Sequence, residues 1–551
     1  MRRAGAAEAS ALLRGLIPRY HRQRGINPLS HVLRLTSHVS RLTSHGRGPT
    51  LSPLDLAVIF LYFALTLGVG VWVSRNQRTA GDYFLGARDL PAWAILLSIV
   101  ATETSALTVI SVPAVAARGD LTFLQLPMGY LVGRLAVAAW LLPGYFTGEQ
   151  ETAYARLEHR FGPATRRVTS GIFLVTRALA DGVRVYAGAI PLAVLARWYG
   201  PNGALPPWNV PAAIIVMSLV TLLYTWHGGL KAVVWVDVMQ LGVYLTGGVV
   251  ALWIASDLAG GLGHTLEAAR AAGKLTLIDP TVNFTHTYTL LGGLVGGAML
   301  SAASHGTDHL IVQRLLASRG LRAARVALVG SGVVVLAQFA LFLLIGIAIW
   351  AAGFAPESIP ADQIFPRFVV DHFPAGLAGM MVAAVLAASM ATHSSAISAL
   401  ASSITHDFYA GWTGRTDPAH LLRVGRAWTL VWGVLITVVA LLFHLIAGGG
   451  QTPVVVFALS IASITYGGLL GAYLLAGGPS WVQGRDVIAA IAVTVAIMLV
   501  VFFAKGLGGL AGLEWLAPAG RLAWPWYVPL GSAITVVTGL ALGTLRGRRG
   551  R

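Results

Sequence analysis

Long apolar stretches separated by short polar segments recur along the whole 551-residue chain. Each holds about 20 residues, enough for a helix to cross the ~30 Å hydrocarbon core of a bilayer. The runs are continuous rather than strictly alternating, which excludes a transmembrane barrel and leaves helices as the spanning structure. We therefore predict an all-α integral membrane protein. Its roughly thirteen transmembrane helices are expected near residues 54–73, 92–117, 121–145, 168–196, 208–226, 232–257, 287–306, 322–352, 375–404, 424–447, 453–477, 486–505 and 525–545.

Composition agrees with this pattern. Hydrophobic residues make up 56% of the chain and charged residues only 11%, which leaves too little polar surface for a soluble globule. The chain has no cysteine, so disulfides, thiolate metal sites and cysteine nucleophiles are excluded. We expect a lipid bilayer as the surroundings and no organic cofactor.

The formal net charge of +17 is distributed as in a membrane protein and does not indicate a nucleic-acid partner. If the first span starts outside, about 20 Lys and Arg residues fall on the inner side and about 7 on the outer side, as the positive-inside rule requires. We predict a multi-pass cell-membrane protein with its N-terminus outside, its C-terminus in the cytoplasm and an odd number of spans. The inner clusters are Arg75/Arg78/Arg88, Arg156/Arg160/Arg166/Arg167 and Arg314/Arg319/Arg322/Arg325.

Residues 1–50 break the charge rule, because they carry 9 Arg and a single acid, Glu8, on the side predicted to be outside. We interpret them as a disordered basic tail or the product of a start site placed too early, with a functional basic arm as the alternative. The expected organisation is this tail, a core at 51–480, and two further C-terminal spans with a short cytoplasmic end at 481–551.

Two spans carry polar or helix-breaking residues at membrane depth. The second contains the run Ala101–Ser105, with Glu103 at its centre, and the seventh contains the glycine-rich run Gly292–Gly297 followed by Ser301. An ionisable residue inside a membrane indicates a functional site. Interrupted helices five spans apart predict inverted repeats, spans 2–6 and spans 7–11, with unwound backbone that exposes carbonyl oxygens. The alternative for the seventh span is that its glycines only allow close helix packing.

Four motifs carry a family resemblance: Tyr83–Arg88, Gly228–Asp237, Ser304–Arg314, and Ser394–Ala396 followed by His406–Tyr409. In this order and spacing, over roughly residues 54 to 480, the chain resembles the sodium/solute symporter family, to which the proline, galactose and sialic acid transporters belong. The resemblance implies a leucine-transporter-type core of five plus five helices, usually with thirteen spans.

The resemblance also implies a sodium site shared across the family. Its ligands are the backbone carbonyls of Ala101, Thr104 and Ala388 and the hydroxyl of Thr392. Ala391 departs from the family pattern, which has a hydroxyl residue there. Since Na⁺ is expected to prefer several oxygen ligands, we expect this site to be weakened unless Thr102, Ser389 or a water compensates.

A second cation site, found in some members, matches Asp237, Ser394 and Ser395. A carboxylate beside two hydroxyls suits a cation. The alternative is that Asp237 forms an interfacial ion pair with Lys231.

For the substrate, Glu103 is the strongest candidate, and it is able to bind solute, attract sodium or carry a proton. The plainer alternative is a helix-to-helix hydrogen bond. The other residues expected to line the same cavity are Ser105, Thr108, Gln125 and Ser301. Leu107 cannot hydrogen-bond a sugar hydroxyl, which argues against a sugar bound in the manner of the galactose transporters.

Arg177, Asp181 and Arg184 share one face of the fourth span through their spacings of four and three. We predict that Asp181 pairs with one or both arginines, because a lone charge in hydrocarbon is costly. The alternative is that a spare arginine meets an anionic substrate. His305 and Asp308 have a spacing that suggests a catalytic pair, but a structural hydrogen bond or a gate contact is favoured.

We therefore predict a secondary active transporter that moves a small organic solute together with Na⁺ by alternating access. It has no catalytic residues and is not an enzyme. Proton-coupled or uncoupled transport, and a membrane sensor or enzyme without transport, remain the alternatives.

Overall fold

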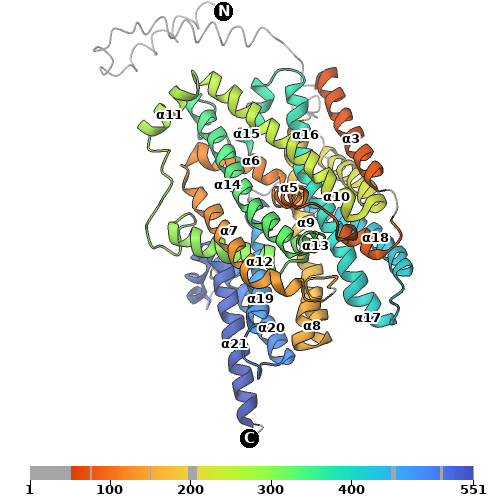
Figure 1. Cartoon of the computed structure of the whole chain (residues 1–551). Helices are drawn as coiled ribbons and strands as arrows, with labels where there is room; N and C mark the ends of the chain where they lie inside the picture. The colour runs from red at the N-terminus through yellow and green to blue at the C-terminus, as the bar shows by residue number, and fades with distance from the viewer. Residues whose placement is uncertain are drawn as a thin grey trace, which may run out of the picture. The chain divides into compact units, whose positions relative to one another are not determined.

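The structure is a computed structural model that describes residues 51–74, 77–148, 150–195, 208–447, 454–508 and 513–549. The predictions for residues 1–50 lie outside these ranges. Within them the chain is helical, and its one β-type pairing is an isolated bridge between Leu90 and Ser318. Figure 1 shows the helices packed against one another, with α19, α20 and α21 at the lower end.

The principal helices are α3 (Pro53–Val73), α4 (Ala80–Leu85), α5 (Ala92–Glu103), α6 (Ala106–Arg118), α7 (Gln125–Ala136), α8 (Ala155–Phe161), α9 (Pro163–Leu195), α10 (Asn209–Leu258), α11 (Leu262–Ala271), α12 (Gly297–Gly306), α13 (His309–Leu316), α14 (Leu321–Ala351), α15 (Ala361–His372), α16 (Leu377–Ser403), α17 (Ala410–Thr413), α18 (Pro418–Ala447), α19 (Val454–Ala476), α20 (Gly484–Leu507) and α21 (Tyr527–Arg549). Three π-helical segments join them, at Val137–Leu141 (η4), Gly292–Gly296 (η6) and Ile404–Tyr409 (η7).

By length and composition, eight helices of the described residues are able to cross a membrane, or nine if the bent pair α5 and α6 forms one span. This confirms an all-α membrane fold. Each predicted span coincides with helical structure, but several of these helices are too short or too polar to pass that test, so the number thirteen stays a prediction. One counted helix, α10, has 50 residues, which is about 75 Å of helix and therefore more than two bilayer crossings need.

A kink at Gly229 divides α10 into the two predicted spans. Gly229 has φ 54° and ψ −157°, which an L-residue rarely adopts. A Cβ added there would lie 2.4 Å from the carbonyl oxygen of Tyr83. Glycine is therefore required both by the backbone angle and by the close approach of α4.

We expect Gly229→Ala to lower the free energy of unfolding by about 1–3 kcal/mol, the usual cost of a strained backbone conformation. The matched control is Gly242→Ala on the same helix, where an added Cβ meets no atom within 4 Å and helix propensity favours alanine. Denaturant titration in mixed micelles measures both. Equal stabilities for the two variants would show that Gly229 carries no special constraint.

Burial separates the lipid-facing helices from the centre of the bundle. Nearly every residue of α16 is buried, and this helix packs against α3, α5, α9 and α10. In contrast, Phe60 on α3, Trp253 on α10 and Val434 on α18 are exposed. Because lipid tails accept apolar side chains, these exposed faces fit a membrane and not water.

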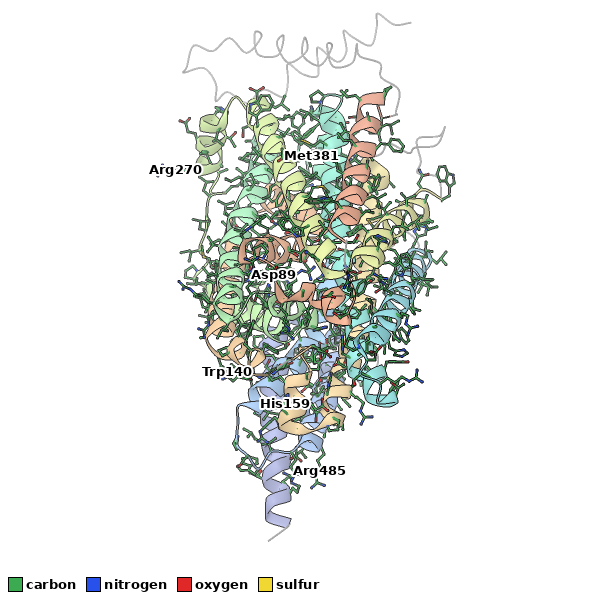
Figure 2. The ribbon with its side chains drawn as sticks, turned by 45° about the vertical axis from the view of Figure 1, so that its right-hand side comes forward. Asp89, Trp140, His159, Arg270, Met381 and Arg485 are labelled. Atoms are coloured by element: carbon green, nitrogen blue, oxygen red, sulfur yellow. The ribbon has the colours of Figure 1, made fainter. Side chains whose placement is uncertain are left out.

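Three residues from predicted loops lie at the end of the bundle that the predicted alternation gives them. Figure 2 labels His159 and Arg485, from two loops predicted to be cytoplasmic, near its lower end. Arg270, from a loop predicted to be outside, lies at the upper end. This arrangement is consistent with the predicted alternation of the spans.

The glycine run of the seventh span does not unwind. The sequence predicts exposed carbonyls at Gly292–Gly297, but the chain there forms the π-helical turn η6 and continues directly into α12. A Cβ on Gly293 would lie 2.7 Å from the carbonyl oxygen of Gln125, and one on Gly133 would lie 2.2 Å from that of Ala298. The prediction of unwound backbone is therefore wrong, and close packing against α7 explains the glycines. The helix is interrupted later, at Thr307 and Asp308.

Candidate functional site

The second predicted span is broken where its polar run lies. Helix α5 ends at Glu103, α6 begins at Ala106, and the two helices are bent by 67°. Thr104 and Ser105 have extended backbone angles, so the carbonyls near the end of α5 lose their helical partners. The amide N–H of Ser105 donates a hydrogen bond to Thr108 Oγ1 of α6, at 3.4 Å. Pro113 lies inside α6 and does not cause the break.

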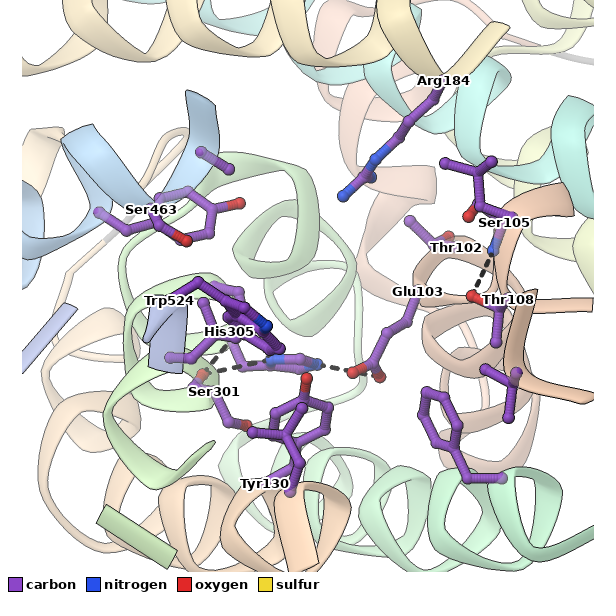
Figure 3. A pocket seen from close by; sticks show the side chains of 18 of the residues that line it. Thr102, Glu103, Ser105, Thr108, Tyr130, Arg184, Ser301, His305, Ser463 and Trp524 are labelled. Atoms are coloured by element: carbon purple, nitrogen blue, oxygen red, sulfur yellow. Dashed lines mark hydrogen bonds and ion pairs between the residues drawn. The ribbon is translucent and has the colours of Figure 1, made fainter. Parts of the chain in front are cut away.

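The break opens onto a cavity of about 240 Å³. Helices α5, α6, α7, α9, α12 and α19 contribute to its wall, and Figure 3 shows their side chains converging on the space. Most of the wall is apolar. The polar and charged lining residues are Thr102, Glu103, Ser105, Thr108, Ser111, Tyr130, Arg177, Arg184, Tyr288, Ser301, Ser304, His305, Ser463, Tyr466 and Trp524.

Glu103 reaches this cavity but is already held by two partners. Its carboxylate forms an ion pair with Arg134 of α7, and His305 Nε2 of α12 lies 3.5 Å away. Arg134 is fully buried and also donates to Ser331 Oγ at 2.6 Å. The helix-to-helix contact expected as the plainer role is therefore present, and a direct role in solute binding stays a prediction.

The charges of the fourth span do not pair with one another. Arg177 forms an ion pair with Asp308, which also accepts a hydrogen bond from Tyr466 at 2.6 Å. Asp181 lies 2.8 Å from His393 Nδ1 on α16. The predicted pairing of Asp181 with the arginines is therefore wrong, because helices distant in sequence supply closer partners.

Arg184 is left over. It lines the cavity, and within the part of the chain that the structure describes it has no hydrogen bond or ion pair. Figure 3 shows its guanidinium pointing into the open space.

Four of the five predicted substrate residues lie in the cavity wall: Glu103, Ser105, Thr108 and Ser301. Gln125 does not. Its side chain is fully buried and donates to the carbonyls of Thr122 and Tyr288 at 3.0 and 3.1 Å, while its Oε1 accepts from the amide of Asp279 at 3.1 Å. Gln125 therefore holds the loop before η6 and does not line the cavity.

Thr104 and Ala388, two of the residues predicted to be ligands of the shared sodium site, lie next to Thr392. The hydroxyl of Thr392 lies 3.1 Å from the carbonyl oxygen of Thr102 and 3.4 Å from those of Thr104 and Ala388. The hydroxyl of Ser389 is buried without a hydrogen-bond partner among the described residues. Oxygens of α5 and α16 thus converge beside the break. Ala101 is also buried, but the Thr392 hydroxyl hydrogen-bonds to the carbonyls of Thr102, Thr104 and Ala388 and not to that of Ala101.

Asp237, the acid of the second predicted cation site, pairs with another side chain of the protein. Asp237 forms an ion pair with Arg314 of α13 at 3.1 Å, and both side chains are fully buried. Asp237 does not pair with Lys231, so that alternative is wrong. Ser395 accepts a hydrogen bond from Arg314, whereas Ser394 donates to the carbonyl of Ala391 at 3.1 Å.

Sequence reasoning missed several cavity residues and one ion pair. Tyr130, Tyr466 and Trp524 line the space, and their only signal in the sequence is a polar aromatic group within or next to an apolar span. Arg314 was recognised as part of an inner basic cluster and as the last residue of the motif Ser304–Arg314, but its ion pair was not predicted. Its partner lies 77 positions away, and no local pattern connects the two.

Comparison with known proteins agrees with this geometry. The sodium/iodide cotransporter of Homo sapiens is 29% identical over 447 residues, covering 78% of this chain and 66% of that protein. A sodium/sialic acid symporter of Proteus mirabilis is 28% identical over 410 residues, covering 70% and 78%. A solved outward-open structure of a Na⁺-coupled sialic acid symporter matches with a TM-score of 0.76 at 23% identity, covering 90% of this chain and 98% of that one, and so shows a shared fold.

The sequence model of the sodium:solute symporter family matches residues 83–462, which is more than half of the chain. The chain therefore belongs to the sodium:solute symporter family, and this membership confirms the prediction of a sodium-coupled membrane transporter rather than an enzyme.

Proposed function

We propose that this protein carries a small organic anion, together with Na⁺, through the cavity at the α5–α6 break. The observation that carries the proposal is Arg184, a cavity-facing cation without an ion-pair partner among the described residues. Relatives of this chain are named for sialic acid and iodide and for monocarboxylates, all of which are anions at neutral pH.

The charges around the cavity support an anionic solute. Glu103 is balanced by Arg134, and Arg177 is balanced by Asp308. Asp181 is turned toward His393 and does not line the cavity. One positive charge is therefore left facing the solute, and a carboxylate forms a strong bidentate contact with a guanidinium.

The walls add a preference for shape and polarity. Leu107, Val112, Phe123, Leu300 and Phe339 are among the apolar residues facing the cavity. An apolar body on the solute would fill this space without leaving its own polar groups unpaired. Hydroxyls such as those of Thr108 and Ser301 orient whatever polar groups the solute carries.

Sodium would bind beside the solute, at the shared site. Backbone carbonyls of α5 and α16 and the hydroxyl of Thr392 are oxygen donors of the kind that hard cations prefer, and the unwound end of α5 leaves carbonyls available. We assign Ala101, Thr104, Ala388 and Thr392 as ligands, with the unpartnered hydroxyl of Ser389 as a further oxygen near Ala388. Since both ligands would stabilise the same conformation, each is expected to tighten binding of the other.

The proposed arrangement of the spans follows the one that the family resemblance implies. We propose thirteen spans with the N-terminus outside, a core at 51–480 made of inverted repeats in spans 2–6 and 7–11, and two additional spans at 481–551. The break between α5 and α6 lies in the second predicted span, and the interruption at Thr307 and Asp308 lies at the end of the seventh. Two interrupted helices five predicted spans apart support the repeat.

Arg184→Gln tests the anion site. We expect this variant to raise the solute KM about tenfold or more, as expected for loss of a charged hydrogen bond, with sodium binding retained. A panel of monocarboxylates is screened first by sodium-dependent thermal stabilisation of the purified protein. Arg184→Lys keeps the positive charge but loses the paired N–H donors of the guanidinium, and its solute KM is expected to be intermediate. The exposed Arg367 on α15 provides the control, as Arg367→Gln. Equal KM values for Arg184→Gln and the control would contradict an anion site at Arg184.

A further inference from the structure

Asp237 lies at the centre of a closed polar cluster between α5, α10, α13 and α16. Its Oδ2 accepts hydrogen bonds from Ser98 Oγ at 2.6 Å and Thr102 Oγ1 at 3.4 Å. Thr102 Oγ1 also lies 3.0 Å from Ser395 Oγ. All of these side chains are buried. The cluster has the composition of a cation site, a carboxylate surrounded by hydroxyls.

The cation present in the cluster is the guanidinium of Arg314. Its Nη2 contacts Asp237 at 3.1 Å and donates to Ser395 Oγ, and its Nε donates to Ser98 Oγ at 2.9 Å. Its Nη1 donates to the carbonyl of Leu310 at 2.8 Å. The guanidinium therefore touches three of the oxygens that a bound Na⁺ would need.

Charge and geometry both oppose a second cation here. Asp237 carries one negative charge and Arg314 one permanent positive charge, so the pair is neutral. A Na⁺ beside the guanidinium would meet repulsion that is strong at short range in a buried site. The remaining oxygen of Asp237, Oδ1, has no hydrogen-bond partner among the described residues, so it is the carboxylate oxygen left to contact an ion.

The helix that carries Arg314 is held in place at its N-terminal end. Arg314 belongs to α13, a short helix that follows the interruption at Thr307 and Asp308. Asp308 caps α13 through the amide of Leu310 at 2.9 Å and holds Arg177 as well. Arg314 therefore belongs to a helix whose N-cap, Asp308, is paired with Arg177, a residue that lines the cavity.

We propose that Arg314 is the resident cation of the second predicted site, so that the transporter binds a single Na⁺, at the shared site around Thr392. This inference rests on the proposed sodium-coupled function. It replaces the predicted Na⁺ at Asp237, Ser394 and Ser395 with an ion pair internal to the protein.

The test is equilibrium binding of ²²Na⁺ to the purified full-length protein, which gives the number of ions per chain without any solute or transport assay. The wild-type protein is expected to bind one ion with a Hill coefficient near one. Arg314→Ala leaves the Asp237 carboxylate without its cation, and a second ion is expected to bind, while Arg314→Lys keeps the count at one.

The double variant Asp237→Asn/Arg314→Gln removes both charges and guards against misfolding of the single variant. It is expected to bind one ion still. Two ions on the wild-type protein, with one lost in Asp237→Asn, would overturn the inference while leaving sodium coupling intact. A single ion that disappears in the double variant but persists in Thr392→Ala would also overturn it. No sodium binding to the wild-type protein would reject both the inference and the proposed coupling.

Discussion

Replacing Arg134 by methionine is expected to lower the free energy of unfolding by about 3–5 kcal/mol, the usual cost of removing one partner of a buried ion pair. The guanidinium of Arg134 is fully buried, contacts Glu103 and donates to Ser331 Oγ. Without it, the Glu103 carboxylate keeps only His305, at 3.5 Å. A largely unpaired charge then remains in a site mostly shielded from water. Denaturant titration in mixed micelles measures the loss.

A double-mutant cycle separates the ion pair from the packing of the arginine stem. Glu103→Gln/Arg134→Met removes both charges, and we expect it to recover at least half of the lost stability. Arg325→Met is the control, because Arg325 is exposed and, among the described residues, donates only to the carbonyl of Ala138, at 2.9 Å. A surface change of this kind alters stability by about 0.5 kcal/mol or less. If single and double variants lose the same stability, the charge pair is not what Arg134 contributes.

Removal of Arg134 also bears on the solute. An uncompensated Glu103 would place a negative charge across the cavity from Arg184, and an anionic solute would be repelled. The pair Glu103–Arg134 therefore does more than join α5 to α7. The pair also keeps the Glu103 carboxylate neutralised on the cavity wall, as the proposed anion site at Arg184 requires.

The helices and the break in the second span follow from sequence because their causes are local. About 20 consecutive apolar residues specify a spanning helix, and the run Ala101–Ser105 has hydroxyls and a carboxylate that a continuous lipid-facing helix cannot accommodate. The seventh span shows the limit of this reasoning. Glycine permits both unwinding and close packing, and only the contact of Gly293 with Gln125 on α7 decides between them.

The polar residues of the site could be found in the sequence, but their partners could not. A buried charge predicts that some partner exists, and Asp181, Arg177 and Asp237 all have one. The partner is chosen by tertiary packing: His393 lies 212 positions from Asp181, and Asp308 lies 131 positions from Arg177. Residues close in sequence, such as Arg184 and Lys231, were the natural expectation and were wrong.

The C-terminal end of α5 connects the cavity with the residues around Thr392 and with the polar cluster around Asp237. Glu103 faces the cavity, the carbonyl of Thr102 meets Thr392, and the hydroxyl of Thr102 meets Asp237 and Ser395. A ligand that changes the conformation of the end of α5 therefore changes a segment that contacts all three places. Reciprocal coupling between sodium and solute requires a shared element whose conformation both ligands bias, and this segment is positioned to be that element.

Thr392→Ala is accordingly expected to raise the Na⁺ concentration for half-maximal binding about 100-fold or more, since loss of an outer partner of a metal site already costs about 10–100-fold. Thr392 supplies the one side-chain oxygen among the assigned ligands, because Ala391 carries a methyl group where the family pattern has a hydroxyl. Thr392→Ser keeps the oxygen and is expected to bind Na⁺ nearly as the wild-type protein does.

The opposite change strengthens the same argument. Ala391→Ser adds a hydroxyl on the turn of α16 that holds Thr392, and we expect the sodium affinity to rise. Thermal unfolding across a sodium series, with choline replacing sodium at constant ionic strength, compares all three variants with the wild-type protein without knowledge of the solute. A sodium-dependent rise in the midpoint that survives in Thr392→Ala would place the ion elsewhere. If the rise is lost in Thr392→Ala and enlarged in Ala391→Ser, the first substitution removes an oxygen ligand of a single site and the second adds one. The methyl group of Ala391, in place of a hydroxyl, then limits the sodium affinity of this transporter.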